Sequence, residues 1–210
     1  MTSSDGCWIS IDGVDGTGKS TIAPRLATLL RAKLSDEFSQ SALGASLRMA
    51  VDVAPNYILH SRVGQSLAFL GDFFEIYETQ IAPAVASRAV IVSDRGWLSK
   101  YAFQFVTLAE ELGADQARTI LADTLGLLPR PNLTLYLIAP MRVVQQRIAH
   151  RDGTCDSSRT LFNRRAHDAA QEAIQTMKYA LPCIVIDATN SLDRVLSDAV
   201  IACSSVLPPI

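Results

Sequence analysis

The sequence has few of the features that are typical of secreted proteins, membrane-spanning proteins or proteins stabilised by a structural metal. Only 4 cysteines occur among 210 residues, spaced from Cys7 to Cys203 without a CxxC pair, so we interpret them as reduced thiols rather than disulfides or zinc ligands. No uninterrupted run of about 18 apolar residues is present, which argues against a transmembrane helix. Residues 1–6 lack the basic and apolar regions of a signal peptide. These absences predict a cytoplasmic protein that does not act at a membrane.

An excess of charge of one sign is also missing. The chain has 19 Lys and Arg against 21 Asp and Glu, a formal net charge of −2, which argues against a general nucleic-acid-binding surface but leaves room for a local phosphate site. With 49% apolar and 19% charged residues, the chain has the composition of a folded protein rather than a disordered one. The length favours a single domain over residues 1–210.

Short apolar runs alternate with longer segments of helical periodicity. We expect strands at Cys7–Asp12, Ala89–Asp94, Leu133–Ala139 and Cys183–Ala188. We expect helices at Thr17–Lys33, Leu43–Val53, Val63–Ser87, Trp97–Leu112, Asp115–Leu125, Arg142–His150, Leu161–Ala180 and Leu192–Val206. Polar, irregular segments are expected at Ser35–Ser41 and Arg151–Arg159. This order predicts an α/β fold in three layers, with helices on both faces of a parallel sheet.

The segment from Gly13 to Ser20 reads GVDGTGKS and matches the P-loop pattern GxxxxGK[ST] at every fixed position. It follows a predicted strand and begins a predicted helix, where backbone N–H groups and the helix N-terminus attract phosphate oxygens. Lys19 is expected at the β- and γ-phosphates of ATP, and the Ser20 hydroxyl on Mg²⁺. The predicted ATP-binding residues are Gly13, Val14, Asp15, Gly16, Thr17, Gly18, Lys19, Ser20 and Thr21.

Asp94 ends a predicted buried strand, which places its carboxylate beside the P-loop. An acid at this position suits a second contact to the Mg²⁺ ion. Asp is also a favoured helix N-cap residue, and the two roles are compatible.

Three segments, taken in order, resemble the thymidylate kinase family. They are ISIDGVDGTGKST from Ile9, SDRGWLSKYAFQ from Ser93 and PNLTLYL from Pro131. The resemblance implies a P-loop kinase fold with a sheet of roughly five parallel strands and a small lid near residues 148–160. It also implies ATP as donor, Mg²⁺ and a nucleotide acceptor.

The resemblance also implies roles for individual side chains. Asp15 matches a residue near the acceptor phosphate or its metal, and Arg95 one that contacts both phosphates. Gly16 stands where some members carry a basic residue, so the catalytic charge is expected from the lid, at Arg147 and Arg151. These two arginines share one face of a helix.

The acceptor side follows the family less closely. Phe69 matches the aromatic that stacks on the base, with core packing an equal alternative, while Ser99 and Phe103 fall in the family's second motif. The arginine that grips the acceptor phosphate aligns with Asp36, next to a retained Glu37, and an acid there is expected to weaken monophosphate binding. The base-reading positions hold Phe73 and Lys100.

Three functions remain open from the sequence. The first is a nucleoside monophosphate kinase, in which Arg48 or Arg62 replaces the missing arginine. The second is a kinase of the same fold that phosphorylates a hydroxyl of a nucleoside or other small molecule, with Glu37 or Asp36 as the base that accepts the proton. The third is a non-catalytic nucleotide-binding regulator. The Phe- and Leu-rich helix at Val63–Ser87 is a candidate surface for a homodimer.

Overall fold

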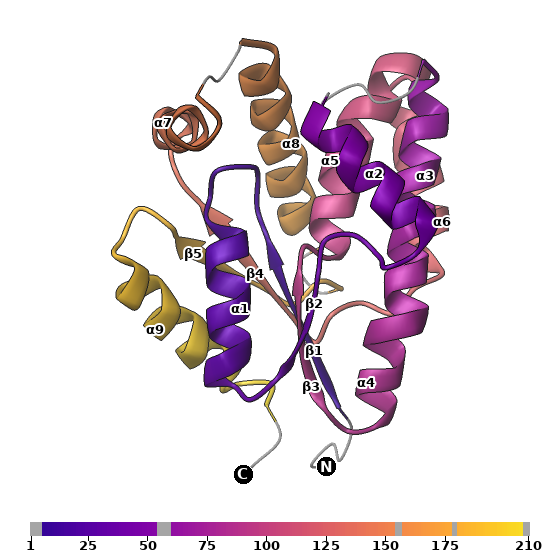
Figure 1. The fold of residues 1–210 in the computed structure, drawn as a ribbon. Coiled ribbons are helices and arrows are strands. Elements are labelled where there is room, and N and C mark those ends of the chain that lie inside the picture. The colour runs from indigo at the N-terminus through magenta and orange to yellow at the C-terminus, as the bar shows by residue number, and fades with distance from the viewer. Residues whose placement is uncertain (1–5, 54–59, 154–156, 178–179, 208–210) are drawn as a thin grey trace.

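The computed structural model describes residues 6–53, 60–153, 157–177 and 180–207. Its centre is a 5-stranded sheet in the order β2-β3-β1-β4-β5, and every neighbouring pair is parallel. The strands are β1 (Cys7–Asp12), β2 (Lys33–Ser35), β3 (Val90–Asp94), β4 (Leu133–Ile138) and β5 (Cys183–Asp187). The expected parallel α/β sheet of a P-loop kinase is confirmed (Figure 1).

Helices cover both faces of this sheet (Figure 1). Helices α1 and α9 lie on one face, and a larger group built around α3, α5, α6 and α8 lies on the other. The helices are α1 (Lys19–Leu29), α2 (Ala42–Val53), α3 (Arg62–Ile76), α4 (Ala82–Ala86), α5 (Trp97–Leu112), α6 (Ala114–Gly126), α7 (Met141–Asp152), α8 (Ser157–Thr176) and α9 (Leu192–Cys203). A π-helical segment, Tyr77–Ile81, joins α3 to α4.

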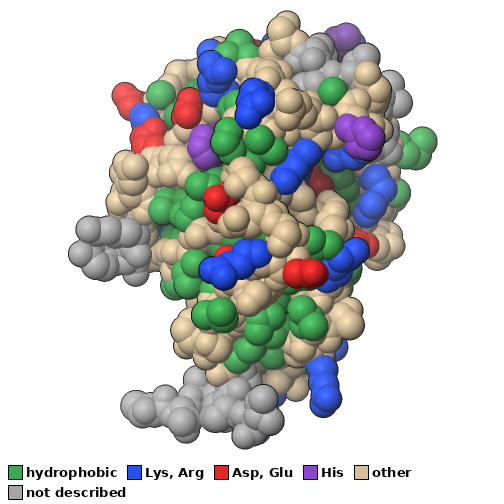
Figure 2. All heavy atoms as spheres, turned by 90° about the vertical axis from the view of Figure 1, so that its left-hand side faces the viewer, with side chains coloured by type: hydrophobic (Ala, Val, Ile, Leu, Met, Phe, Trp, Pro, Cys, Tyr) green, Lys and Arg blue, Asp and Glu red, His purple; other side chains and the backbone are tan. Residues whose placement is uncertain are grey.

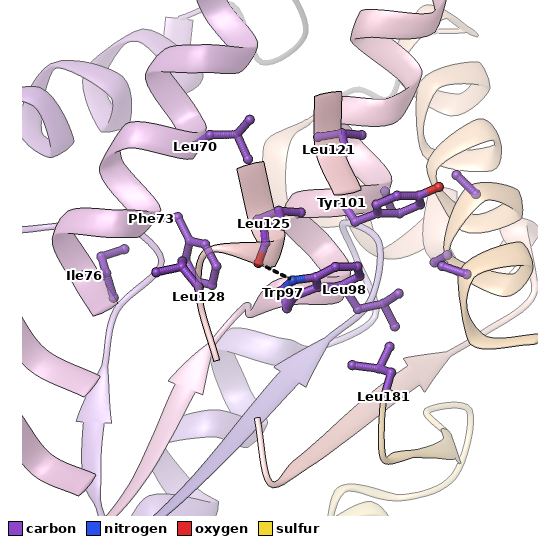
Figure 3. Close-up of a cluster of buried hydrophobic side chains, with 14 of the residues drawn as sticks. Leu70, Phe73, Ile76, Trp97, Leu98, Tyr101, Leu121, Leu125, Leu128 and Leu181 are labelled. Carbon is purple, nitrogen blue, oxygen red and sulfur yellow. Dashed lines mark hydrogen bonds between the residues drawn. The ribbon is translucent and has the colours of Figure 1, made fainter. Parts of the chain in front are cut away.

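The alternation of side chains along a strand explains the two cores. In β1, Cys7, Ile9 and Ile11 point to the side covered by α1 and α9, whereas Trp8 points to the opposite side. The larger core is shown in Figure 3, where the Trp97 indole donates a hydrogen bond to the Leu125 carbonyl at 3.1 Å. Because both faces are buried, the central strands carry continuous apolar runs, which made them visible in the sequence.

The structure corrects three of the predicted elements. Lys33 ends no helix but begins β2, a strand whose exposed Lys33 and Leu34 give it no apolar signal. The predicted loop at Arg151–Arg159 is helical at both ends: α7 continues to Asp152, Gly153 caps it with a φ of 80°, and Ser157 begins α8. Residues 154–156 of that loop lie outside the described residues. The long helix at Val63–Ser87 is helical but passes through the π segment.

The described surface carries charges of both signs. Figure 2 shows Lys and Arg side chains interspersed with acidic and hydrophobic ones over the face that includes α7 and α9. No helix in the described ranges is both long and apolar enough to cross a membrane. Cys7, Cys183 and Cys203 are free thiols, while Cys155 lies outside the described residues. Burial raises the pKa of the Cys7 thiol to about 11, so it is not a reactive thiolate at neutral pH.

Candidate active site

A cavity of about 1180 Å³ opens at the carboxyl ends of the strands, where ligands bind in open parallel sheets. One end is formed by the loop between β1 and α1, and by Asp94 at the end of β3. The other end is formed by α2, α3 and α5. Arginines from α7 and α8 line it as well. The two halves of one continuous cavity therefore face each other across the end of the sheet.

The P-loop holds its lysine in a buried position. Lys19 is only 4% exposed, and its ammonium donates a hydrogen bond to the Val14 carbonyl at 3.0 Å. Burial, together with the charge of Arg95, lowers the pKa of Lys19 to about 8, although the nearby acids Asp15, Asp94 and Glu37 oppose this shift. The lysine is thus a poorly solvated cation at the place where phosphate oxygens are expected.

Gly16 explains why the loop brings no further positive charge of its own. Its φ of 82° lies in the left-handed region, and a Cβ built there meets the Val144 carbonyl of α7 at 2.9 Å. A basic side chain at this position would require α7 to shift. A basic side chain near this part of the cavity therefore has to come from another element of the structure.

The carboxylate of Asp94 fits a Mg²⁺ site. It lines the cavity beside Ser20, and its Oδ1 atom is buried without a hydrogen-bond partner among the described residues. No cluster of three or more His, Cys, Asp or Glu side chains occurs in the described ranges. A single carboxylate with a hydroxyl suits Mg²⁺, because this ion keeps waters and takes substrate phosphates as its remaining ligands.

Arg95 stands between the two halves of the cavity. Its Nη2 pairs with Asp15 Oδ1 of the P-loop at 2.6 Å, and its Nε pairs with Glu37 Oε1 at 2.5 Å. The guanidinium also lies 4.8 Å from the centre of the Phe103 ring. Burial lowers the pKa of Arg95, but the charges of Glu37, Asp15 and Asp94 outweigh this and raise it above its ordinary value. The ion pair with Arg95 also shifts the pKa of Asp15. Burial raises this pKa, but the positive charges of Arg95 and Lys19 outweigh burial and hold it well below its usual range.

The backbone of Arg95 is held in an unusual conformation by its neighbours. Its φ is 74°, and its N–H donates to the Ile11 carbonyl at 2.9 Å. The fully buried Asp12 Oδ1 accepts the backbone N–H groups of Gly96 and Ser99, both at 2.9 Å, at the start of α5. A Cβ at Gly96 would lie 2.4 Å from the Ser10 Cβ, so only glycine allows this close approach. Strain at a functional residue persists when its surroundings fix it in this way.

An ion-pair chain ties the ends of α7 and α8 to the P-loop. Arg159 Nη1 pairs with Asp152 at 2.7 Å, and its Nη2 lies 3.6 Å from Asp15 Oδ2. Asp152 also receives two bonds from Arg151, at 2.6 and 2.9 Å, which hold the pKa of Asp152 at about 2. Arg147 donates to the Ala188 carbonyl at 2.8 Å. All three arginines line the cavity, but Arg151 is 60% exposed and Arg159 only 15%.

The other end of the cavity is aromatic and basic. Phe38 and Phe69 pack with their ring centres 6.2 Å apart. The Lys100 ammonium lies 5.7 Å from the first ring and 5.9 Å from the second. The Arg48 guanidinium lies over the Phe38 ring, 5.4 Å from its centre. Asp36 is exposed at the rim of this region. Flat apolar surfaces beside cations suit a heterocyclic base.

Comparisons with known proteins agree with this geometry. A family model described as thymidylate kinase matches residues 11–199. The chain is 31% identical over 202 residues to a thymidylate kinase of Xanthomonas euvesicatoria, covering 92% of this chain and 81% of the relative. It is 28% identical over 207 residues to a thymidylate kinase of Bifidobacterium longum, covering 90% and 93%. A probable thymidylate kinase of Pyrobaculum aerophilum is 26% identical over 192 residues, covering 91% and 93%.

The chain belongs to the thymidylate kinase family. The resemblance inferred from the three sequence segments is thereby confirmed, and so is the expectation of a nucleotide kinase, a phosphotransferase. The two other functions, a hydroxyl kinase and a non-catalytic regulator, are not favoured by these matches.

Most residues singled out by the thymidylate kinase motifs do line the one cavity. They are Asp15, Gly16, Thr17, Gly18, Lys19, Ser20, Thr21, Asp36, Glu37, Arg48, Phe69, Asp94, Arg95, Ser99, Lys100, Phe103, Arg147 and Arg151. Gly13 and Val14 belong to the P-loop but do not line the cavity. Val14 is buried against apolar side chains of α7 and α8. Arg62, the alternative clamp, instead pairs with Glu110 and Glu111 of α5 and does not line the cavity.

Phe73 is the correction among the thymidylate kinase positions. It was expected to read the acceptor base, but it is 1% exposed, belongs to the core with Leu70 and Ile76, and does not line the cavity. Its ring contributes only indirectly, because the Lys100 ammonium lies 5.7 Å from its centre. The apolar side chain of Phe73 thus fills core volume instead of reaching the cavity.

Sequence reasoning missed two residues of the site. Arg159 lies in a segment predicted to be a loop, although its Nη2 reaches to 3.6 Å from the P-loop carboxylate of Asp15. Asp12 ends the first predicted strand, and its carboxylate accepts hydrogen bonds from the backbone N–H groups of Gly96 and Ser99 at the start of α5. A buried acid at the end of an apolar strand was the available signal for Asp12, whereas nothing in the local pattern of Arg159 distinguishes it from a surface arginine.

Proposed function

We propose that the protein transfers the γ-phosphoryl group of ATP to the phosphate of a nucleoside 5′-monophosphate of the thymidylate class. One observation carries the proposal: Arg95 binds a P-loop acid and an acceptor-side acid at once, inside one cavity. A guanidinium held there suits bidentate contact with phosphate oxygens from both substrates. In the absence of substrates, the carboxylates of Asp15 and Glu37 bind the guanidinium of Arg95 in the positions proposed for the phosphate oxygens.

The donor side has the parts that phosphoryl transfer needs. Lys19 and the N-terminal N–H groups of α1 are proposed to hold the ATP phosphates. Ser20 and Asp94 are proposed to hold Mg²⁺, which neutralises charge on the phosphate oxygens when bound. Asp15 pairs with Arg95 and is proposed to orient the acceptor phosphate through this arginine.

The lid arginines are proposed to supply charge at the transferring group. Arg147 and Arg151 share the cavity-facing side of α7, and Arg159 reaches the P-loop from α8. Because Gly16 leaves no room for a basic P-loop residue, these side chains are the nearby source of positive charge.

The test is an ATP-consumption screen across nucleosides and their 5′-monophosphates, with Mg²⁺ present. Activity on thymidine monophosphate or deoxyuridine monophosphate is the expected result. Activity confined to nucleosides would refute the proposal and would favour Glu37 as a base for a hydroxyl. Since Glu37 already forms an ion pair with Arg95, its carboxylate is better placed to position that arginine than to accept a proton.

We also infer a cytoplasmic location for this reaction. It is supported by Cys7, Cys183 and Cys203, which are free thiols in the structure.

A further inference from the structure

The loop between β2 and α2, residues 36–41, carries part of the acceptor end of the cavity. The Glu37 carboxylate pairs with Arg95, and the Glu37 backbone carbonyl accepts a hydrogen bond from Lys100 at 3.4 Å. The next residue, Phe38, is 5% exposed and packs against an aromatic ring of α3. Because the loop is neither helix nor strand, contacts with other elements have to hold these side chains in place.

One buried carboxylate, that of Asp72 on α3, holds the end of this loop. Asp72 is 0% exposed, and its Oδ1 accepts a hydrogen bond from the Ser39 hydroxyl at 2.5 Å. The Ser39 backbone N–H donates to the same carboxylate, at 3.2 Å to Oδ2 and 3.4 Å to Oδ1. The Ser39 hydroxyl also lies 2.7 Å from the Ser41 hydroxyl, which accepts the Gly44 N–H in the first turn of α2. Since a buried carboxylate is costly unless it is hydrogen-bonded, its charge ties Ser39 to α3.

Helices α2 and α3, which pack against each other (Figure 1), leave room for this contact. A Cβ built at Gly44 would lie 2.7 Å from Asp72 Oδ1, so a larger residue there would push α2 away from α3. Asp72 and Phe69 are an i,i+3 pair and lie on the same side of α3. They hold adjacent residues of the loop, because the Phe69 ring packs with Phe38 and the Asp72 carboxylate binds Ser39.

We propose that Asp72 is a positioning residue of the acceptor site, which acts through Ser39 to fix Glu37 and Phe38 at the cavity. Neither Asp72 nor Ser39 lines the cavity, so neither is placed to touch a substrate. Since Glu37 lies just before Phe38 and Ser39, a shift of Ser39 also moves the carboxylate that pairs with Arg95. The inference rests on the proposed function and adds the group that sets its acceptor-side geometry.

The first experiment compares Ser39→Ala with Ser46→Ala. Ser39→Ala removes one donor to Asp72 and leaves the backbone N–H in place. Ser46 is the matched control, because it is an exposed serine of α2 outside the cavity whose hydroxyl donates to the Ala42 carbonyl of its own helix. We expect Ser39→Ala to raise KM for thymidine monophosphate by about tenfold, as for loss of a hydrogen bond to a charged group, and to change KM for ATP by less than about threefold.

A second pair of variants changes the carboxylate itself. In Asp72→Asn the amide oxygen can still accept the Ser39 N–H, whereas Asp72→Ala leaves that N–H without its partner. Asp72→Asn should therefore have a lower KM for thymidine monophosphate than Asp72→Ala. Melting curves accompany the kinetics, and if Asp72→Ala does not fold, Ser39→Ala decides. A role in stability alone would lower the Tm of these variants without raising the KM for the acceptor.

An unchanged acceptor KM in Ser39→Ala, or an equal rise of KM for both substrates, would overturn the inference. If the unmodified protein phosphorylates no nucleoside monophosphate, the proposed function fails, and hydrogen–deuterium exchange of residues 36–41 decides the inference instead. Faster exchange of this loop in Ser39→Ala than in Ser46→Ala supports positioning by Asp72. Equal exchange in the two variants overturns it.

Discussion

The donor half and the acceptor half of the cavity are built in different ways. The donor half is a contiguous loop, Gly13 to Ser20, whose lysine donates a hydrogen bond to a carbonyl of the same loop. The acceptor half is assembled from β2, α2, α3 and α5, so that Glu37, Phe69 and Lys100 come from distant parts of the chain. A contiguous loop keeps its geometry when its fixed residues are kept. An assembled surface changes whenever one of its helices exchanges a side chain.

The exchange of charge at the acceptor end shows this difference. Phe73 is part of the core, and the ammonium of Lys100, from another helix, lies 5.7 Å from the centre of its ring. At the rim, Asp36 puts a negative charge where the family resemblance predicts a positive one. The donor half keeps every fixed residue of the P-loop pattern. The acceptor end is therefore where this chain is expected to differ most from its relatives in substrate preference.

The largest expected effect is in the donor half. Lys19→Ala should lower kcat by at least about 10³-fold, because the loop loses its only side-chain cation at the phosphates. The fold should persist, since the Lys19 ammonium contacts a loop carbonyl rather than the apolar core. Steady-state kinetics with a melting curve measure both. Lys33→Ala serves as control, and near-normal kcat in Lys19→Ala would contradict the assignment of the loop.

The next effect concerns the lid. Arg159→Ala should lower kcat by about 10²-fold with a smaller change in KM for ATP, as expected of a charge used mainly in the transition state. Arg151→Ala should follow the same pattern, with a smaller loss because the Arg151 side chain is 60% exposed. Arg164, exposed on α8 and outside the cavity, is the matched control. A pure KM effect would reduce these arginines to ATP-binding residues.

A smaller change is expected at the acceptor rim. Asp36→Arg should raise kcat/KM for thymidine monophosphate by about tenfold, because repulsion of the acceptor phosphate is replaced by a charge-assisted contact. KM for ATP should stay constant, which separates this change from one in the donor half. Asp123→Arg, an exposed acid of α6 outside the cavity, controls for net charge. High activity of the unmodified protein, unaffected by Asp36→Arg, would show that another cation already binds this phosphate.

The smallest effect is a pH dependence of ATP binding. The pKa of Lys19 lies at about 8 in the free protein, so the ammonium is lost as the pH rises through that value. The Kd for Mg·ATP should therefore rise between pH 8 and pH 9, by at most about tenfold for one proton. Calorimetric titration measures it, and Lys19→Arg should abolish the rise because its charge persists. A rise that survives in Lys19→Arg would assign the titration to another group.

The same pKa shift has a consequence for stability. In the folded protein Lys19 holds its proton less tightly than at its ordinary pKa of 10.5. Between pH 8 and 10.5 the unfolded chain then binds more protons, so this group makes unfolding less favourable as the pH rises.

Periodicity and motif predicted most of the fold for a physical reason. The strands β1, β3 and β4 are buried on both faces, so their apolar runs stand out, and the P-loop is local in sequence. The exposed edge strand β2 lacks such a run and was missed. The helix ends at Arg151 and Arg159 were missed because the polar residues there are typical of a loop. In the structure, ion pairs of both arginines with Asp152 stabilise these helix ends instead.

The sequence by itself determined the ATP-binding loop, the sheet and the family, because each depends on residues close together in the chain or on a repeated pattern of burial. Only the tertiary structure decided which side chains share the acceptor end. It buried Phe73 in the core, joined Arg95 to both Asp15 and Glu37, and left the Lys100 ammonium without an acid partner among the described residues. Such contacts join residues separated by tens of positions, and their distances depend on how helices pack rather than on local sequence.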